Sequence, residues 1–213
     1  MNEKEIRTMN FEIRAEENEK HGSHIVGTPI VYGQVTDLGF AREVIDTGAL
    51  DGDTDLKDVR FLIGHNVGMV PLARSRNNNE NSTMQLMITD RGLEIRVDLD
   101  TENNSDAKKL YSAVQRGDIS GMSFMFIVDR AEWEELDSES PLRHIRHIRK
   151  VFEVSAVAFP AYEGTDLQTA SEETAPEGGG IPLESAAKRE LKEARDRKAQ
   201  DERRQKALDV LRR

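Results

Sequence analysis

Residues 84–99 read MQLMITDRGLEIRVDL, and this stretch decides the fold class. Every second residue on either side of a central Asp90-Arg91-Gly92 is apolar: Met84, Leu86 and Ile88, then Leu93, Ile95, Val97 and Leu99. An apolar period of two is typical of a strand with one buried face, and the glycine supplies the turn. The stretch therefore predicts an antiparallel β-hairpin.

Other short runs, rich in β-branched and aromatic residues, predict further strands at residues 11–14, 25–32, 59–63, 71–75, 123–128 and 146–159. One helix is predicted over residues 106–116, because Asn104 or Ser105 can cap its start and Gly117 its end. A second, short helix is expected near residues 41–45. Many strands beside few helices favour a mainly β fold, an antiparallel barrel or sandwich with peripheral helices.

The composition excludes several classes of function. The chain has 213 residues, no cysteine and a net charge of −10, with 37% hydrophobic and 33% charged residues. The absence of cysteine excludes thiol catalysis, disulfides and cysteine zinc sites. The acidic balance argues against general nucleic-acid binding, and no apolar run approaches the ~18 residues of a membrane span. The first residues lack an apolar signal-peptide core, so a cytosolic protein is expected.

The chain is expected to divide into three parts. Residues 1–166 hold the predicted strands, and residues 167–182 have the glycine, proline and small polar residues of a linker. Residues 183–213 are rich in Ala, Lys, Arg and Glu, which favours a helix. Residues 184–213 carry eleven Lys and Arg against seven Asp and Glu, a net charge of +4, which leaves −14 on the rest. This tail is expected to be a solvated or partner-binding helix.

A serine in the run GDISGMSFMF, residues 117–126, is the first candidate for chemistry. Ser123 stands at the start of an apolar strand, behind two glycines that let the backbone turn sharply. A nucleophile can occupy such a position, and so can an ordinary strand serine. The surroundings differ from the Gly-x-Ser-x-Gly elbow because Phe124 and Met125 follow the serine.

A base and a carboxylate are candidates for the partners of this serine. His65 ends a short apolar strand beside Gly64, and a neutral imidazole can take a serine proton. The alternative for His65 is a surface turn. Glu153 interrupts the apolar run VFEVSAV, and a buried charge there needs a partner. That partner is an imidazolium, or an arginine such as Arg74, unless the side chain faces outward.

Two further histidines suggest a metal pair. His144 and His147 lie in the run RHIRHIRK, residues 143–150, among several cations. No third ligand is sensibly spaced, so a solvated basic strand or hairpin is the favoured interpretation. The sequence therefore predicts neither a metal nor a cofactor.

Taken in order, these segments resemble the prohead maturation protease family of tailed bacteriophages. The resemblance covers roughly residues 8–166, and the segments that carry it are residues 25–32, 40–50, 58–66, 71–74, 117–124 and 153–162. Each segment alone is weak evidence for the family, and the resemblance is strong because the segments occur together in the family's order and spacing. The family is similar in fold to herpesvirus assemblin, which implies an antiparallel β-barrel ringed by helices, here with a C-terminal helical tail.

The resemblance also implies roles for particular residues. His65 would be the base and Ser123 the nucleophile of a serine endopeptidase. Assemblin has a second histidine as its third member, and here the matching strand carries Glu153 instead. Backbone N–H groups would stabilise the oxyanion, and Gly121 and Met122 are the candidates to supply them. Arg74 is a candidate to assist catalysis, directly or through water.

The family's biology implies the partners. Its substrates are the scaffolding segment of the major capsid protein or a separate scaffold protein, and the protease often cleaves itself. The chain is expected to self-associate inside the prohead in the host cytoplasm, with no specific nucleic-acid or membrane partner. One alternative is a non-enzymatic capsid-assembly protein whose charged tail binds the inner shell. Another is a small-ligand barrel, for which one tryptophan and few other aromatics provide little lining.

Overall fold

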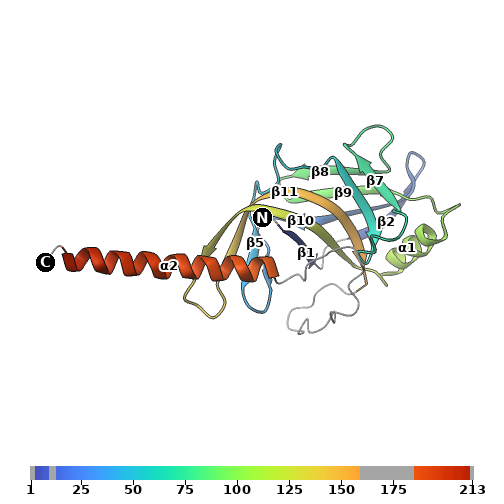
Figure 1. Ribbon diagram of the computed structural model, residues 1–213. Coiled ribbons are helices and arrows are strands. Elements are labelled where there is room, and N and C mark those ends of the chain that lie inside the picture. Colours follow the sequence, from blue (N-terminus) through green and yellow to red (C-terminus); the bar gives the residue numbers. More distant parts are fainter. Residues whose placement is uncertain (1–2, 10–12, 159–184, 212–213) are drawn as a thin grey trace.

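The computed structural model describes residues 3–9, 13–158 and 185–211, and within them the chain forms two β-sheets and two helices (Figure 1). The expected linker, residues 167–182, and the expected strand end at residue 159 lie outside the described residues. The strand order of the larger sheet is β1-β10-β11-β5-β4, with β6 on β11 and β7 on β6. The smaller sheet has the order β2-β3-β9-β8.

The larger sheet is mixed. Its strands are β1 (Lys4–Met9), β4 (Val35–Asp37), β5 (Arg42–Ile45), β6 (Asp58–Ile63), β7 (Ala73–Arg76), β10 (Gly121–Glu134) and β11 (Leu142–Val157). β5 pairs parallel with the start of β11 and β6 pairs parallel with its end, because the 16 residues of β11 offer enough edge for both. The expectation of a purely antiparallel fold is therefore wrong.

The smaller sheet contains the hairpin predicted from residues 84–99. Its strands are β2 (Ile13–Asn18), β3 (Gly22–Val31), β8 (Met84–Thr89) and β9 (Gly92–Asp98). β8 and β9 pair antiparallel, with Thr89 opposite Gly92. Gly92 has φ +143°, and a Cβ there would lie 1.9 Å from the carbonyl oxygen of Ile30. Only glycine lets this turn pack so closely on β3.

Neither a closed barrel nor a ring of helices is found among the described residues, so the assemblin-like architecture is not confirmed. The peripheral helix α1 (Ser105–Arg116) forms as predicted. Asn104 caps its start by accepting from the N–H groups of Asp106 and Ala107, and Gly117 ends it in the left-handed region at φ +79°. The prediction of a short helix near residues 41–45 is wrong. Residues 42–45 form β5, between β4 and β11, where Val44 and Ile45 are buried.

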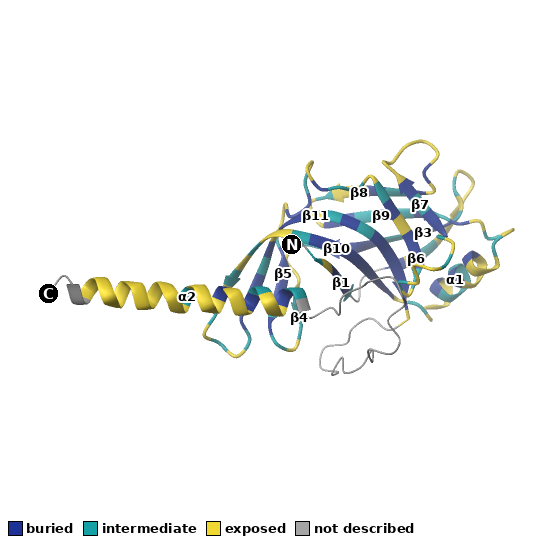
Figure 2. Ribbon diagram, in the orientation of Figure 1, coloured by how far each residue is buried: buried dark blue, intermediate teal, exposed yellow. Residues whose placement is uncertain are grey.

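A single apolar core joins the sheets and α1 (Figure 2). The larger sheet contributes Phe61, Phe124 and Phe126, and the smaller sheet contributes Ile25, Ile30 and Leu93 among others. On β10 every second side chain, at Met122, Phe124 and Phe126, belongs to this core, and Ser123 lies between the first two. Since neighbouring strand residues point to opposite faces, Ser123 faces away from this core.

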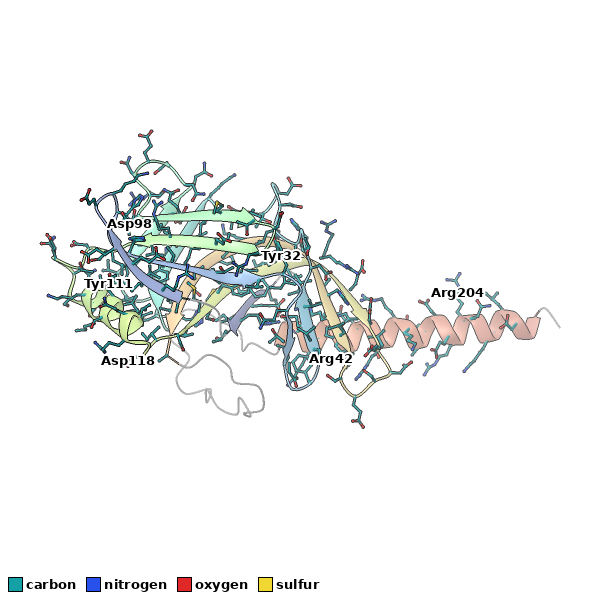
Figure 3. The ribbon with its side chains drawn as sticks, turned by 180° about the vertical axis from the view of Figure 1, so that it is seen from behind. Tyr32, Arg42, Asp98, Tyr111, Asp118 and Arg204 are labelled. Atoms are coloured by element: carbon teal, nitrogen blue, oxygen red, sulfur yellow. The ribbon has the colours of Figure 1, made fainter. Side chains whose placement is uncertain are left out.

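The tail is helical, as the sequence predicts. α2 (Ser185–Leu211) packs its first turns on the body through buried Ala187, Leu191 and Ala194, and residues beyond these are largely exposed (Figure 2). It projects from the end of the body opposite α1, and Arg204 lies far out along it (Figure 3). Neither helix among the described residues has the length and apolarity needed to span a membrane.

Candidate active site

Ser123 is the third residue of β10 and is fully buried, at 0% exposure. On either side of it in the sheet lie Thr8 of β1 and Ser155 of β11. The Oγ atom of Ser123 lies 2.6 Å from Nε2 of His65 and 2.9 Å from Oγ1 of Thr8. It also lies 2.8 Å from the carbonyl oxygen of Arg7, to which it can donate. The serine proton therefore has an imidazole acceptor and a carbonyl acceptor within reach.

His65 follows the end of β6, and its backbone conformation is unusual. Gly64 and His65 both have positive φ, +57° and +59°, although a side chain is uncommon in this region. The backbone N–H of His65 donates to Oγ of Ser155 at 3.0 Å. Because β6 runs parallel to β11, this turn brings the imidazole over the end of β11, toward Ser123. The His65 side chain is 20% exposed, so the site is open to solvent on the imidazole side.

Glu153 completes the contact chain from the other side of the imidazole. Its Oε1 lies 2.6 Å from Nδ1 of His65, and its Oε2 accepts a 2.6 Å hydrogen bond from Oγ of Ser155. Glu153 is 2% exposed, and a carboxylate buried to this degree requires partners. The structure thus brings Ser123, His65 and Glu153 together in the order hydroxyl, imidazole, carboxylate. Both ring contacts fall within the ~2.6–3.2 Å reach that proton transfer needs.

Arg74 is not part of this group. It lies on β7, and its guanidinium forms two hydrogen bonds to Asp58, at 2.6 and 2.9 Å. The hydrogen bond from Arg74 lowers the pKa of the Asp58 carboxyl below its ordinary value. The salt bridge between Glu153 and Arg74 that the sequence left open is therefore replaced by one between Asp58 and Arg74.

Gly121 and Met122 are the first two residues of β10, immediately before the serine. The Met122 side chain is fully buried in the core. The Met122 backbone lies between Met9 of β1 and Ala156 of β11 in the sheet.

The histidine pair lies on a strand of a hairpin, β11 paired with β10, as expected, but this strand is not solvated throughout, because Arg143 and His147 are buried. His147 is 6% exposed, with Nδ1 2.5 Å from Asp129 and Nε2 3.2 Å from Asp51. His144 pairs instead with Asp46 at 3.0 Å. Within the described part of the chain, no cluster of three or more His, Asp or Glu side chains could hold a metal ion.

A buried ion network lies close to the site and reaches the tail helix. Arg7 binds Glu43 through two hydrogen bonds and also binds Glu5, and Arg143 contacts Glu5, Glu43 and Glu190 of α2. Burial alone would raise the pKa of Glu43, but Arg7 and Arg143 outweigh it and lower that pKa below its ordinary value.

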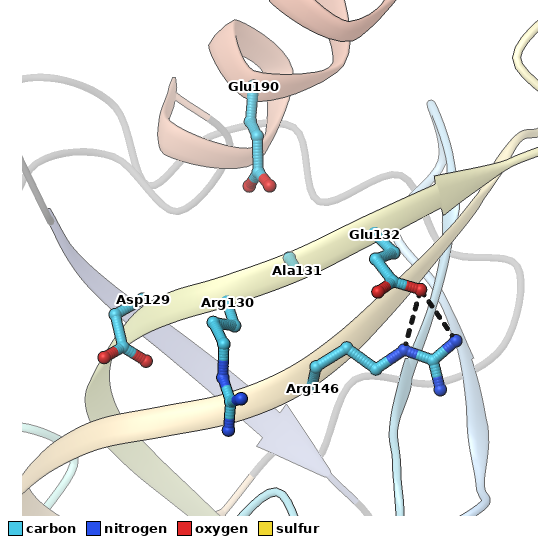
Figure 4. Close-up of a pocket in the computed structure, with 6 residues that line it drawn as sticks. All are labelled: Asp129, Arg130, Ala131, Glu132, Arg146 and Glu190. Carbon is cyan, nitrogen blue, oxygen red and sulfur yellow. Dashed lines mark hydrogen bonds and ion pairs between the residues drawn. The ribbon is translucent and has the colours of Figure 1, made fainter.

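Burial alone would lower the pKa of Arg143, and Glu43 and Glu5 raise it instead. A hollow lined mainly by charged side chains opens where Glu190 faces β10 and β11 (Figure 4). In this hollow Arg146 pairs with Glu132, and the lining gives no support to an apolar ligand cavity.

Sequence reasoning misses three partners in the site. Ser155 lies two residues after Glu153 on the same strand face, and this small polar residue in an apolar run is a signal that could have found it. Thr8 and the carbonyl of Arg7 give no local signal. They reach Ser123 through β1, a strand that the sequence does not predict, across more than 110 positions.

Comparison with known proteins supplies one match. A family model described as caudovirus prohead serine protease covers residues 9–177 of the chain. No curated protein and no solved structure was found to match this chain.

Proposed function

Because the chain belongs to the caudovirus prohead serine protease family, we propose that it is a capsid-maturation endopeptidase with Ser123 as nucleophile, His65 as base and Glu153 as orienting acid. The observation that carries the assignment of residues is the unbroken contact from Ser123 through His65 to Glu153. Three residues from three separate strands or strand ends meet there with the polarity that acyl transfer requires.

In the proposed reaction the Oγ atom of Ser123 attacks the scissile carbonyl carbon while Nε2 of His65 takes the hydroxyl proton. Glu153 holds the Nδ1–H side of the ring and stabilises the imidazolium that forms. The imidazolium then gives its proton to the leaving amine as the C–N bond breaks. A water molecule, deprotonated by the same ring, hydrolyses the acyl-enzyme and restores Ser123.

The tetrahedral intermediates carry a negative oxygen that needs hydrogen-bond donors. We assign this role to backbone N–H groups at Gly121 and Met122, which directly precede the nucleophile on β10. Arg74 takes no part in the proposed reaction, because its guanidinium is paired with Asp58. The reaction needs no metal or cofactor in this proposal.

The proposed substrate is the scaffolding segment of the major capsid protein, or a separate scaffold protein, inside the prohead. The support is the family description, which places such proteases in the prohead. Self-cleavage and self-association within the prohead, in the host cytoplasm, are part of the same proposal.

The direct test is co-expression of the chain with its capsid precursor, followed by gel analysis. Ser123→Ala and His65→Ala are each expected to leave the precursor uncleaved while circular dichroism and melting temperature show a folded chain. Normal processing by either folded variant would overturn the assignment.

A second candidate function is a non-enzymatic capsid-assembly protein that keeps a protease-like domain. The exposed, charged outer part of α2 favours it, because such a helix can bind an inner shell surface. Deletion of residues 168–213 separates the two. A protease should still cut a peptide after this deletion, whereas an assembly protein would show no cleavage with or without the tail.

A further inference from the structure

A closed ring of three hydrogen bonds surrounds the base, and Ser155 is the residue that closes it. Glu153 Oε1 contacts His65 Nδ1, the His65 backbone N–H donates to Ser155 Oγ, and Ser155 Oγ donates to Glu153 Oε2. We propose that Ser155 is a fourth member of the active site, a positioning residue that acts through Glu153 and His65. The inference rests on the proposed serine-protease function.

The ring fixes the carboxylate. Glu153 has two oxygens, and with Ser155 as donor each oxygen has its own partner at 2.6 Å. The side chain then has one orientation in which both contacts form, so Oε1 stays directed at Nδ1 of the imidazole. Without the Ser155 hydroxyl, Oε2 of Glu153 would lose this hydrogen-bond donor. The carboxylate could then rotate toward a different donor and away from Nδ1 of His65.

The ring also fixes the backbone that carries the imidazole. His65 and Gly64 both lie at positive φ, and such a conformation persists only where surrounding contacts hold it. The hydrogen bond from His65 N–H to Ser155 is one of these contacts. Since Ser155 is directly opposite Ser123 in the β10–β11 pair, the same strand position anchors the base beside the nucleophile.

The residue type at position 155 fits this role. The Ser155 hydroxyl is committed to the Glu153 carboxylate and the His65 N–H, so Ser155 acts through these two neighbours. Its one hydroxyl serves as donor to a carboxylate and acceptor from an amide at the same time. Alanine would leave both groups without this partner, cysteine would fill the space with a weaker donor, and threonine would keep the hydroxyl.

The test is steady-state cleavage of a capsid-precursor peptide by the full chain. Ser155→Ala and Ser155→Cys are expected to lower kcat by roughly 10- to 100-fold with KM unchanged, because misplacing a catalytic group slows the chemical step. Ser155→Thr should recover most of the rate. Ser75→Ala is the matched control, since Ser75 lies on β7, is equally buried and donates a hydrogen bond to Asn78.

A double-mutant cycle decides whether Ser155 acts through the carboxylate. In a Glu153→Gln background, Ser155→Ala is expected to lower kcat by a smaller factor than in the wild type, because the contact to the carboxylate is already gone and only the contact to the His65 N–H remains to be lost. The proposal is overturned if Ser155→Cys keeps the wild-type kcat, or if Ser155→Ala costs as much in the Glu153→Gln background as alone. Failure of the protease assignment itself looks different, because wild type would then cleave no better than Ser123→Ala.

Discussion

At the scale of single residues, the candidate site contains a carboxylate that is buried and has a partner for each oxygen. Glu153 is 2% exposed, and its two oxygens contact His65 and Ser155. An apolar strand gains nothing from such a residue in folding, because a buried charge rarely stabilises more than an apolar side chain of similar size. Its place in this strand is therefore explained by what it does for the imidazole.

Glu153→Gln is expected to lower kcat by roughly 10²- to 10⁴-fold, because an amide holds the ring without stabilising its positive charge. Peptide cleavage rates measure this loss, and Glu132→Gln is the control, since that carboxylate is exposed and pairs with Arg146. A Glu153→Gln enzyme within three-fold of wild type would show that the third position of the site lies elsewhere.

The candidate site is partly predictable because residue type and local surroundings identify Ser123, His65 and Glu153. A serine after glycine, a histidine after glycine and a carboxylate in an apolar run are each visible in a few neighbouring residues. The hydrogen bonds of Thr8 and of the Arg7 carbonyl depend on strand pairing at long range. They could not be predicted from local pattern.

At the scale of secondary structure, the hairpin turn places a strict demand on one residue. Gly92→Ala is expected to destabilise the chain by roughly 2–5 kcal/mol, since the new Cβ combines a left-handed φ with a clash against Ile30. Gly52→Ala is the matched control, because nothing lies within 4 Å of its added Cβ. Urea denaturation of both variants gives the comparison, and equal midpoints would contradict the packing described for this turn.

The elements divide clearly between those that local pattern predicts and those that it does not. The β8–β9 hairpin and α1 are predictable, because alternation and caps are encoded within about 16 residues. Residues 42–45 form a strand, and not the expected helix, because β4 and β11 supply pairing edges from 35–37 and 142–145. β1 is not predicted because it has no apolar face. Its alternate residues Glu5 and Arg7 are charged, and they are buried through ion pairs.

The ion pairs that hold β1 to β5 give the fold a dependence on pH. Arg7 and Arg143 hold the pKa of Glu43 below its ordinary value of 4.5, so the stabilisation is complete above that value and lost as pH falls through the folded-state pKa. Glu43→Gln should cost about 3–5 kcal/mol at pH 7, because two buried guanidiniums lose a partner. The difference from wild type should shrink as pH falls below about 4.5.

Denaturation of both proteins between pH 3 and pH 7 provides the measurement, with the exposed Glu80→Gln as control. A difference that grows on acidification, or that is absent at pH 7, would contradict the stabilising role given to the Glu43 carboxylate.

At the scale of the whole molecule, the tail helix is attached to the body over its first turns and free beyond them. Ala187, Leu191 and Ala194 are buried, Glu190 joins Arg143, and Arg195 reaches the carbonyls of Leu136 and Ser138 at the β10–β11 turn. The family match ends at residue 177, so α2 lies outside it. The contacts of α2 with the body are therefore made by residues beyond the matched range.

Leu191→Asp is expected to release α2 from the body, because it places a charge in the buried contact. Limited proteolysis should then remove the tail at least ten-fold faster, while peptide cleavage stays within two-fold of wild type because the site lies on other elements. Leu208→Asp, on the exposed part of the same helix, is the control. Unchanged proteolysis of Leu191→Asp would contradict the docking described here.

The central claim for the molecule is that Ser123 is a nucleophile activated by His65. Its most direct test is the reaction of the full chain with a fluorophosphonate, which bonds covalently to an activated serine Oγ, followed by mass-spectrometric mapping of the adduct. The account predicts one adduct, on Ser123, that disappears in His65→Ala. An adduct on another serine, no adduct in the wild-type chain, or labelling of Ser123 that persists in His65→Ala would contradict it.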